Sequence, residues 1–442
     1  MSRPVSRSTF ADSAKSDSFP TSESLATLAA FQRRTLIVLI ITQVIGTVGV
    51  GVGPSIGVLL AGQVTDNEAW AGLARTASTL GAAVFGLPLG NLAARKGRRV
   101  ALSTGWWTAA AGAGILVAAA QWNLVIPLFT GLFLIGAGSA VALQARFAAT
   151  DLAPAHHKGR ALALVVWVGT LGSVLGPNLG APGELISEHS GLTIFAAAFL
   201  IAAIFMTLAG INVFIFLRPD PLVIAEQSAG ESGKTEKQRG RQRGSIRHIL
   251  IAMRENRLAR TAVLAILVAQ VVMVAVMTMT PVHIVHEGGS VNLVGLTISL
   301  HVAGMYALSP VVGILTDRYG FRLPMWMGIG IFLASLILGV VKPNDMGWVV
   351  ISLILLGLGW SFVNVSASAL FSTSVSPQVR ASSQGGVDAL SNLFGATAAF
   401  AAGPLLVATS FATLSAVSIV VLFPLIAVLL RTRVSSTERG EG

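Results

Sequence analysis

Uncharged apolar runs long enough to cross a bilayer recur along the whole sequence, and they limit its possible folds more than any other feature. A membrane-spanning helix needs about 20 consecutive apolar residues. Of the 442 residues, 53% are hydrophobic and only 11% are charged, and the mean hydropathy is +0.76. Soluble domains carry about 25% charged residues. The sequence therefore predicts an all-α membrane protein with the lipid bilayer as its surroundings.

The apolar runs divide into twelve expected helices. Their ranges are 35–60, 72–93, 100–120, 124–147, 160–182, 192–217, 260–283, 292–314, 324–341, 347–372, 382–407 and 409–430. The stretch between the sixth and seventh runs is rich in Glu, Lys, Arg and Gly, and it cannot bury enough apolar area to fold alone. We expect two pseudo-symmetric six-helix bundles with polar segments around them. The expected division is a disordered cytoplasmic tail at 1–34, bundles at 35–217 and 260–430, a cytoplasmic linker at 218–259 and a cytoplasmic tail at 431–442.

The basic residues fall on one side of the expected spans. The net charge is +11 and the isoelectric point is near 11.1, which would also suit a nucleic-acid binder. If the first span runs from inside to outside, however, all 30 Lys and Arg except Arg75 and Lys342 lie on the cytoplasmic side. The charge then orients the protein with both termini in the cytoplasm, and no nucleic-acid partner is expected. The polar N-terminal stretch lacks the pattern of a cleaved signal peptide, so we expect a multi-pass protein of the plasma (inner) membrane.

Several other classes of protein are disfavoured by missing motifs. The chain has no Cys, and its seven His show no metal-ligand spacing, so we expect no metal and no cofactor. There is no phosphate-binding loop of the kind that drives a primary pump. No cluster of acids or His marks a membrane enzyme, so we expect a protein that is not an enzyme. We also expect a monomer.

The two halves repeat each other. GNLAARKGRR at 90–99 returns as GILTDRYGFR at 313–322, each between the second and third helices of its half. Gly176-Pro177 matches Gly403-Pro404, and Gln43 matches Gln270, at nearly the same offset. Because each half has an even number of helices, the repeats are parallel and related about an axis along the membrane normal.

The repeated loop resembles the G-x-L-x-D-R-x-G-R-[RK] signature of the major facilitator superfamily. The matching positions are Gly90, Leu92, Arg95, Gly97, Arg98 and Arg99 in the first copy and Gly313, Asp317, Arg318, Gly320 and Arg322 in the second. The glycines permit a tight turn, and a carboxylate and a guanidinium can latch helix ends in one conformation and release them in another. The alternative is that the cations only mark the cytoplasmic side, which we favour for Lys96 and Arg99.

The two copies are not equivalent, because Ala94 replaces the carboxylate of the signature. A latch on the first copy must therefore pair Arg98 with another acid, such as Asp151. The complete latch is expected in the second half, where Asp317 is present.

The fifth helix resembles the G-x-x-x-G-P-x-x-G-[GA] motif of the proton-driven exporters of this superfamily. Its matching residues are Gly172, Gly176, Pro177 and Gly180, followed by Ala181. The glycines give one smooth face for close helix packing, and the proline bends the helix. Ordinary small-residue packing is the alternative. Many such exporters also carry an Arg in helix four where this chain has Leu132, so that residue role is not carried over.

Proton coupling needs an ionisable group in surroundings where its charged form is energetically unfavourable. Asp388 is the carboxylate that lies clearly inside an expected span. A charge near the bilayer centre costs about 2.5–3.5 kcal/mol on insertion scales. If the Asp388 carboxylate moves between a buried apolar environment and a cationic partner, it takes up a proton in the first and releases it in the second. Arg146 and His301 are the other candidates. The alternatives are a static salt bridge for Asp388, an interfacial residue for Arg146 and a packing histidine for His301.

The resemblance also implies that the first and fourth helices of each half line a central cavity. The candidate cavity residues are Gln43, Thr47, Gln144, Gln270, Met273, Met277, Trp360, Ser361 and Asn364. Met and aromatic side chains suit varied apolar ligands, although they are also ordinary packing residues. We expect a secondary active transporter that works by alternating access and couples efflux of a small amphipathic or hydrophobic solute to protons, as an antiporter. The alternative is a proton symporter or uniporter that imports a small metabolite.

Overall fold

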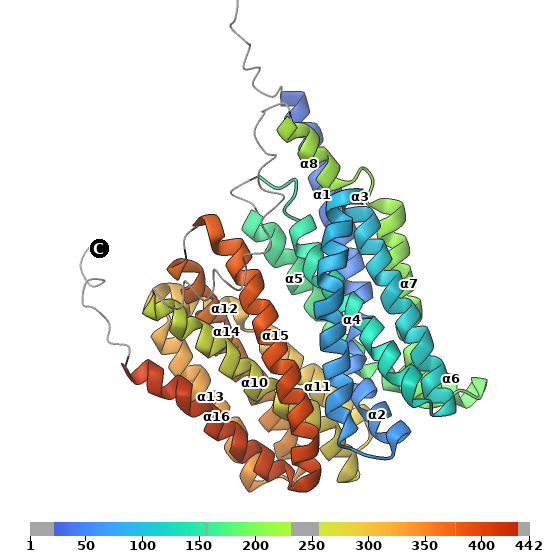
Figure 1. The fold of residues 1–442 in the computed structure, drawn as a ribbon, viewed down its shortest axis with the longest axis vertical. Helices are drawn as coiled ribbons and strands as arrows, with labels where there is room; N and C mark the ends of the chain where they lie inside the picture. The colour runs from blue at the N-terminus through green and yellow to red at the C-terminus, as the bar shows by residue number, and fades with distance from the viewer. Residues whose placement is uncertain (1–21, 155–157, 231–255, 376, 432–442) are drawn as a thin grey trace, which may run out of the picture.

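The computed structural model describes residues 22–154, 158–230, 256–375 and 377–431, and within these ranges it is helical and without strands. The predicted tail segments 1–21 and 432–442 and the linker segment 231–255 lie outside the described residues. Figure 1 shows two helical bundles side by side, one coloured blue to green and the other yellow to red.

The first bundle contains the helices from α1 to α7. They are α1 (Ser22–Gly51), η1 (Gly53–Gly57), α2 (Val58–Thr65), α3 (Trp70–Trp122), α4 (Val125–Ala148), α5 (Lys158–Leu175), η3 (Gly176–Leu179), α6 (Gly180–Ser190) and α7 (Ile194–Phe216), followed by α8 (Pro221–Gly230). The second bundle contains α10 (Arg257–His286), α11 (Val291–Tyr306), α12 (Ser309–Tyr319), α13 (Arg322–Val341), α14 (Met346–Ser374), α15 (Pro377–Ala408) and α16 (Phe411–Arg431). Each bundle has its own apolar core, built around Trp106 and Phe199 in the first and Phe332 and Phe371 in the second.

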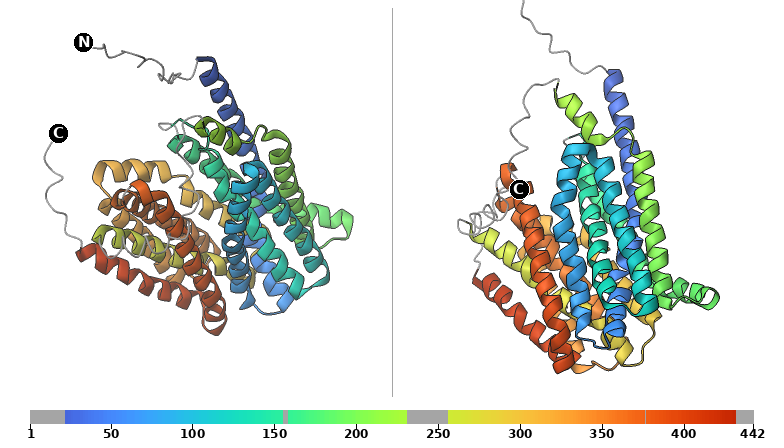
Figure 2. Two further views of the ribbon diagram at one scale, coloured as in Figure 1. Left: turned by 45° about the horizontal axis from the view of Figure 1, so that its top comes forward. Right: turned by 45° about the vertical axis from the view of Figure 1, so that its right-hand side comes forward.

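Ten stretches in the described chain are long and apolar enough to cross a membrane. Two expected spans do not meet that criterion, namely the first part of α3 and the interrupted fifth helix, α5–η3–α6. The count is consistent with the twelve expected spans, since both segments are helical and belong to the first bundle (Figures 1 and 2). The protein is a multi-pass helical membrane protein, as predicted.

The second and third expected helices, 72–93 and 100–120, are joined through one residue. Gly97 has φ 86° and ψ 169°, a conformation outside the helical region, inside the continuous range of α3. The carboxylate of Asp220 accepts a hydrogen bond from Arg99 N at 2.8 Å and occupies the space that a Cβ on Gly97 would need. The tight turn therefore depends on a glycine that both this backbone conformation and this contact require.

Three spans are interrupted where the sequence places prolines. The first span continues beyond the expected residue 60 through η1, which contains Pro54, into α2. The fifth is broken at η3 by Pro177, and the eighth is broken between α11 and α12, before Pro310. Proline removes a backbone hydrogen bond and forces the chain out of regular α geometry.

The polar segments contain more helix than predicted. α1 begins at Ser22 instead of near residue 35, and α8 occupies 221–230 of the expected linker. The Ala- and Leu-rich residues 25–30 are strong helix formers, which favours the extension of α1 toward its N-terminus.

The helix order gives the molecule two distinct ends. We call the end that carries the start of α1, Gly97, α8 and Gly320 the linker end, and the opposite end, which carries the loops at Asp66–Ala69 and Glu287–Ser290, the hairpin end.

The bundles pack closely at the hairpin end. Thr76 Oγ1 donates to Ala396 O at 2.9 Å, and Asn178 Nδ2 donates to Ser299 Oγ at 2.6 Å. At the Gly72–Ala399 contact the backbones approach so closely that a Cβ on the glycine would not fit. This end of the interface between the bundles is therefore closed.

We expect Gly97→Ala to destabilise the protein, because a side chain in this glycine-specific conformation costs about 1–3 kcal/mol and displaces Asp220. Gly90→Ala is the matched control. Gly90 lies in a regular helix, and a Cβ there would meet nothing within 4 Å. Thermal unfolding in detergent measures both. A melting temperature for Gly97→Ala equal to that of Gly90→Ala would show that this turn is not constrained as described.

Candidate functional site

The first copy of the repeated loop holds a two-pronged ion pair. Arg98 Nε lies 2.8 Å from Asp151 Oδ2, and Arg98 Nη2 lies 3.2 Å from Asp151 Oδ1. The side chains are 16% and 13% exposed. Such paired contacts between guanidinium and carboxylate are the stronger kind of charged hydrogen bond. The structure therefore brings together the two residues suggested for this latch, while Gly90 is half-buried and Arg95 is exposed beside them.

The second copy is unlatched in this conformation, which differs from the expectation that it would hold the complete latch. Asp317, Arg318 and Gly320 are exposed, and Asp317 makes no hydrogen bond or ion pair within the described part of the chain. A Cβ on Gly313 would meet nothing within 4 Å. Arg322 Nη2 donates to Leu429 O at 3.3 Å and so ties α13 to α16. The carboxylate of the motif is not sufficient to form a latch in this conformation, because α12 places Asp317 on an exposed face.

The helix-five motif lies where three helices meet. The Cα–H faces of Gly172 and Gly176 pack against the α1 backbone, and a Cβ on Gly176 would lie 2.5 Å from Val48 O. Pro177 and Gly180 face the second bundle, and a Cβ on Gly180 would lie 2.9 Å from Val291 Cγ1 on α11. The motif therefore packs α1 against the fifth helix with its first half and reaches the closed hairpin-end interface with its second half.

An ion pair joins the bundles nearer the linker end. Arg146 Nη2 in the last turn of α4 donates to Asp388 Oδ2 in α15 at 3.1 Å. The two side chains are 23% and 52% exposed, so the protein does not enclose the pair. Arg146 also donates from Nε to Leu143 O at 3.1 Å, and its guanidinium lies 5.3 Å from the centre of the Phe147 ring. The two ionisable residues singled out in these spans thus contact each other across the interface.

Arg75 is a site residue that the sequence reasoning missed. The charge distribution predicts that Arg75 lies on the outer side, and the structure shows it half-buried in α3, close enough to Tyr306 and His301 of α11 to interact with both electrostatically. Its guanidinium makes no hydrogen bond or ion pair with any described residue. One signal was available, since Arg75 falls inside the expected span 72–93.

Aromatic and amide groups of the second bundle lie beside this charge. The Tyr306 and Trp360 rings meet edge to face with centroids 5.9 Å apart, and Trp360 Nε1 donates to Gln270 Oε1 at 3.1 Å. Gln270, Tyr306 and Asn364 are half-buried. Of the other predicted cavity residues, Met273, Met277 and Ser361 are buried in the second bundle. Tyr306 was not singled out from the sequence.

The predicted cavity residues of the first bundle hold its helices together. Gln43 Nε2 donates to Ala142 O at 3.1 Å, Thr47 Oγ1 to Gly169 O at 2.9 Å, and Gln144 Nε2 to Gly86 O at 3.0 Å. All three side chains are buried. Their hydrogen-bond donors are therefore already paired within the first bundle.

His301 is fully buried between α11 and α14. Its Nδ1 lies 2.7 Å from Leu353 O, and its Nε2 has no partner in the described residues. Gly357 of α14 packs against it so closely that a Cβ would clash with its backbone. The surroundings fit a packing histidine that also lies within electrostatic reach of Arg75. Among the residues described, no three His, Asp or Glu side chains gather in a way that could hold a metal ion.

Comparison with known proteins identifies relatives over nearly the whole chain. The family model of the Major Facilitator Superfamily matches residues 25–290 and 262–442. The uncharacterized MFS-type transporter YdeG of Bacillus subtilis is 37% identical over 404 residues, which are 91% of this chain and 92% of that protein. The riboflavin transporter RfnT of Brucella anthropi is 29% identical over 410 residues, covering 91% of this chain and 95% of that protein.

Solved transporter structures share the fold at low sequence identity. A point mutant of the nucleoside transporter NupG matches with a TM-score of 0.69 and 15% identity, over 89% of this chain and 99% of that chain. An auto-inhibited peptide transporter of the POT family matches with a TM-score of 0.66 and 15% identity, over 92% and 99%. The family, the fold and the relatives are those of membrane transporters. The chain belongs to the Major Facilitator Superfamily and is a multi-pass membrane transporter.

Proposed function

We propose that this transporter moves a small solute by alternating access and couples its movement to protons. The observation that carries the proposal is the ion pair between Arg146 and Asp388, because each partner belongs to a different bundle. Protonation removes the charge of Asp388 and weakens the pair. The two bundles are then less firmly held at this end, which favours a rocking motion of one against the other.

The close packing of the bundles at one end supports this proposal. Close backbone packing and hydrogen bonds join the bundles at the hairpin end, whereas Asp388 is exposed. The one-sided distribution of Lys and Arg supports cytoplasmic termini and hence a cytoplasmic linker end. We propose a monomer in the plasma membrane that opens toward the cytoplasm in this conformation.

Export in exchange for protons is the direction that we propose first. It is supported by the resemblance of Gly172, Gly176, Pro177 and Gly180 to the exporter motif and by the position of Pro177 and Gly180 in the closed interface. A small amphipathic or hydrophobic solute suits the edge formed by Tyr306 and Trp360, since aromatic faces accept flat apolar groups and nearby amides orient them. Riboflavin is a sensible first probe, because one relative is named as its transporter.

A second candidate is symport of an anionic solute with protons, and it is favoured by the charge balance between the bundles. Two guanidinium groups, those of Arg75 and Arg146, lie within electrostatic reach of Tyr306, and among the described residues only Arg146 of the two pairs with a carboxylate, that of Asp388. An unpaired charge in such surroundings is costly, and a carboxylate or phosphate on the solute would supply the missing partner. Protonation of Asp388 frees Arg146, so proton binding and anion binding then strengthen each other.

We expect Asp388→Asn to abolish proton-driven transport in proteoliposomes while leaving the protein folded, because an amide cannot release a proton. Asp317→Asn is the matched control, since Asp317 is exposed and makes no bond in the described chain. The measurements are solute flux under an imposed pH gradient and the melting temperature. Flux through Asp388→Asn that still follows the gradient would exclude this residue as the coupling group.

The direction of coupling follows from how pH changes solute binding. In symport of an anion, affinity rises as pH falls, and Arg75→Gln weakens binding of an anionic solute about tenfold, or roughly 1.4 kcal/mol, but not of a neutral analogue. In proton exchange, affinity falls as pH falls, because proton and solute compete. Binding titrations at two pH values distinguish the two functions, and affinity independent of pH would count against both.

The latch proposal can be tested separately, because the two loop copies differ in their pairing. Asp151→Asn removes one partner of a mostly buried charged pair, so we expect a loss of roughly 1–3 kcal/mol in stability with slower transport. Asp317→Asn removes a solvated, unpaired charge, and we expect a change within about 0.5 kcal/mol. Thermal unfolding compares them. Equal midpoints would mean that the Arg98–Asp151 pair does not support the fold.

A further inference from the structure

A groove of about 490 Å³ runs between α1 and α7 at their linker ends, on the outer side of the first bundle. Its volume is within the range of ligand-binding pockets, roughly 300–1,000 Å³. The residues that line it are Ala30, Arg33, Arg34, Ile37, Val38, Ile41, Asn212 and Phe216. None of the groups described above as candidates for coupling or solute binding lies in it.

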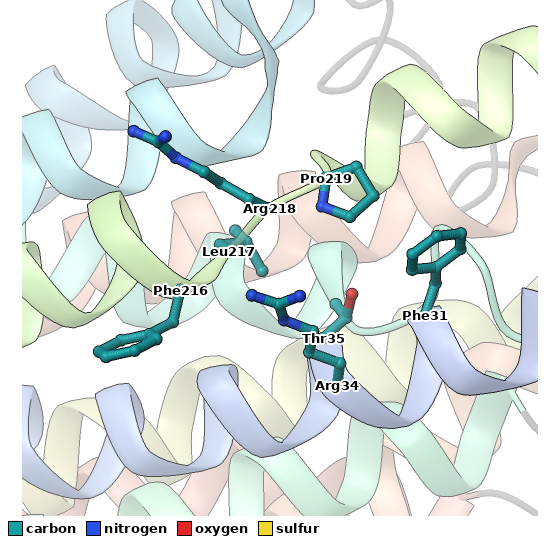
Figure 3. A pocket seen from close by; sticks show the side chains of 7 residues that line it. All are labelled: Phe31, Arg34, Thr35, Phe216, Leu217, Arg218 and Pro219. Carbon is teal, nitrogen blue, oxygen red and sulfur yellow. The ribbon is translucent and has the colours of Figure 1, made fainter.

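The groove is cationic at the linker end. Arg33 and Arg34 are both exposed, and neither forms an ion pair with a described residue. Figure 3 shows Arg34 reaching from α1 toward Leu217, beside Phe216, whereas Arg218 extends away from it. No acidic side chain lines the groove, so nothing in its wall balances the two positive charges.

The remainder of the groove is apolar and open. Ile37, Ile41 and Phe216 are 48%, 42% and 50% exposed. Asn212 is the polar amide in the wall, and its Nδ2 is already used, donating to Val38 O at 3.1 Å and to Thr42 Oγ1 at 2.8 Å. The groove therefore offers two guanidinium groups at one end and an apolar wall that runs away from them along the helices.

We propose that this groove binds one phospholipid with an anionic headgroup. Its phosphate groups lie against Arg33 and Arg34, and an acyl chain lies along Ile37, Ile41 and Phe216. Basic residues beside apolar grooves at a membrane surface favour anionic over zwitterionic lipids, at about 1 kcal/mol for each basic residue. Asn212 bonds α1 to α7, so a lipid seated over this junction would brace the two helices.

The internal repeat provides a matched control for the charges. Gln43 of α1 corresponds to Gln270 of α10, and the same offset places Arg260 at the position of Arg33. Arg257 and Arg260 are exposed near the start of α10, and the groove does not include them. Two double variants therefore remove equal charge at related places. Arg33→Gln/Arg34→Gln changes the groove, and Arg257→Gln/Arg260→Gln leaves it intact.

The experiment titrates detergent-purified full-length protein with phosphatidylglycerol or phosphatidylcholine and counts bound lipid by native mass spectrometry. We expect wild type to prefer phosphatidylglycerol, and Arg33→Gln/Arg34→Gln to bind it roughly 30-fold more weakly, from two lost charges. Arg257→Gln/Arg260→Gln should bind it as wild type does. Equal binding of the two lipids by wild type, or equal loss in the two double variants, would overturn the proposal in favour of a general surface charge effect.

A second variant tests the apolar part of the groove without altering charge. Ile41→Trp fills the groove, so we expect it to weaken binding of phosphatidylglycerol while the melting temperature without lipid stays unchanged. Unchanged lipid binding by a folded Ile41→Trp protein would place the lipid elsewhere. The outcome is independent of proton coupling, because none of these residues belongs to the proposed transport site.

Discussion

A charged side chain between helices in lipid must pair with an opposite charge or face water, and this constraint governs the arrangement between the two bundles. Charged groups near the bilayer centre are costly, and they persist where they pair with each other or face a water-filled space. Arg146 and Asp388 pair across the interface. Arg75 has no partner among the described residues and lies near Tyr306. The site therefore carries one more positive than negative charge, which is the physical basis for considering an anionic solute.

Close packing at the opposite end complements this charged region. The Gly72–Ala399 contact leaves no room for a side chain, and Pro177 contacts Gly295 of the other bundle. Small residues allow such close packing, where dispersion contacts replace the hydrophobic effect that lipid does not provide. The bundles are therefore joined by close backbone packing at one end and by the exposed ion pair of Arg146 and Asp388 nearer the other.

The repeated loop shows how one motif serves two environments. In the first copy, Gly97 makes the turn, Asp220 caps it, and Arg98 reaches Asp151. In the second copy, Gly320 makes a similar turn with φ 74°, but Asp317 remains exposed. The acids that complete the first copy come from outside its motif, so the motif pattern alone did not indicate which copy would be latched.

The sequence by itself determined the membrane location of the chain, its helical class, the duplication and the turn glycines. Long uncharged runs exclude other folds in lipid, because only structures that satisfy their own backbone hydrogen bonds can span it. It also suggested Arg98 with Asp151, and it singled out Arg146 and Asp388 individually. Tertiary structure alone decided that these two meet, that Arg75 turns inward, that Gln43 and Gln144 bond within their own bundle, and that Arg33 and Arg34 head a groove. The reason is that spans that are apolar on nearly all faces show little helical periodicity in sequence. Packing against the other helices therefore fixes the rotation of each helix, and this rotation decides which residues surround its few polar groups.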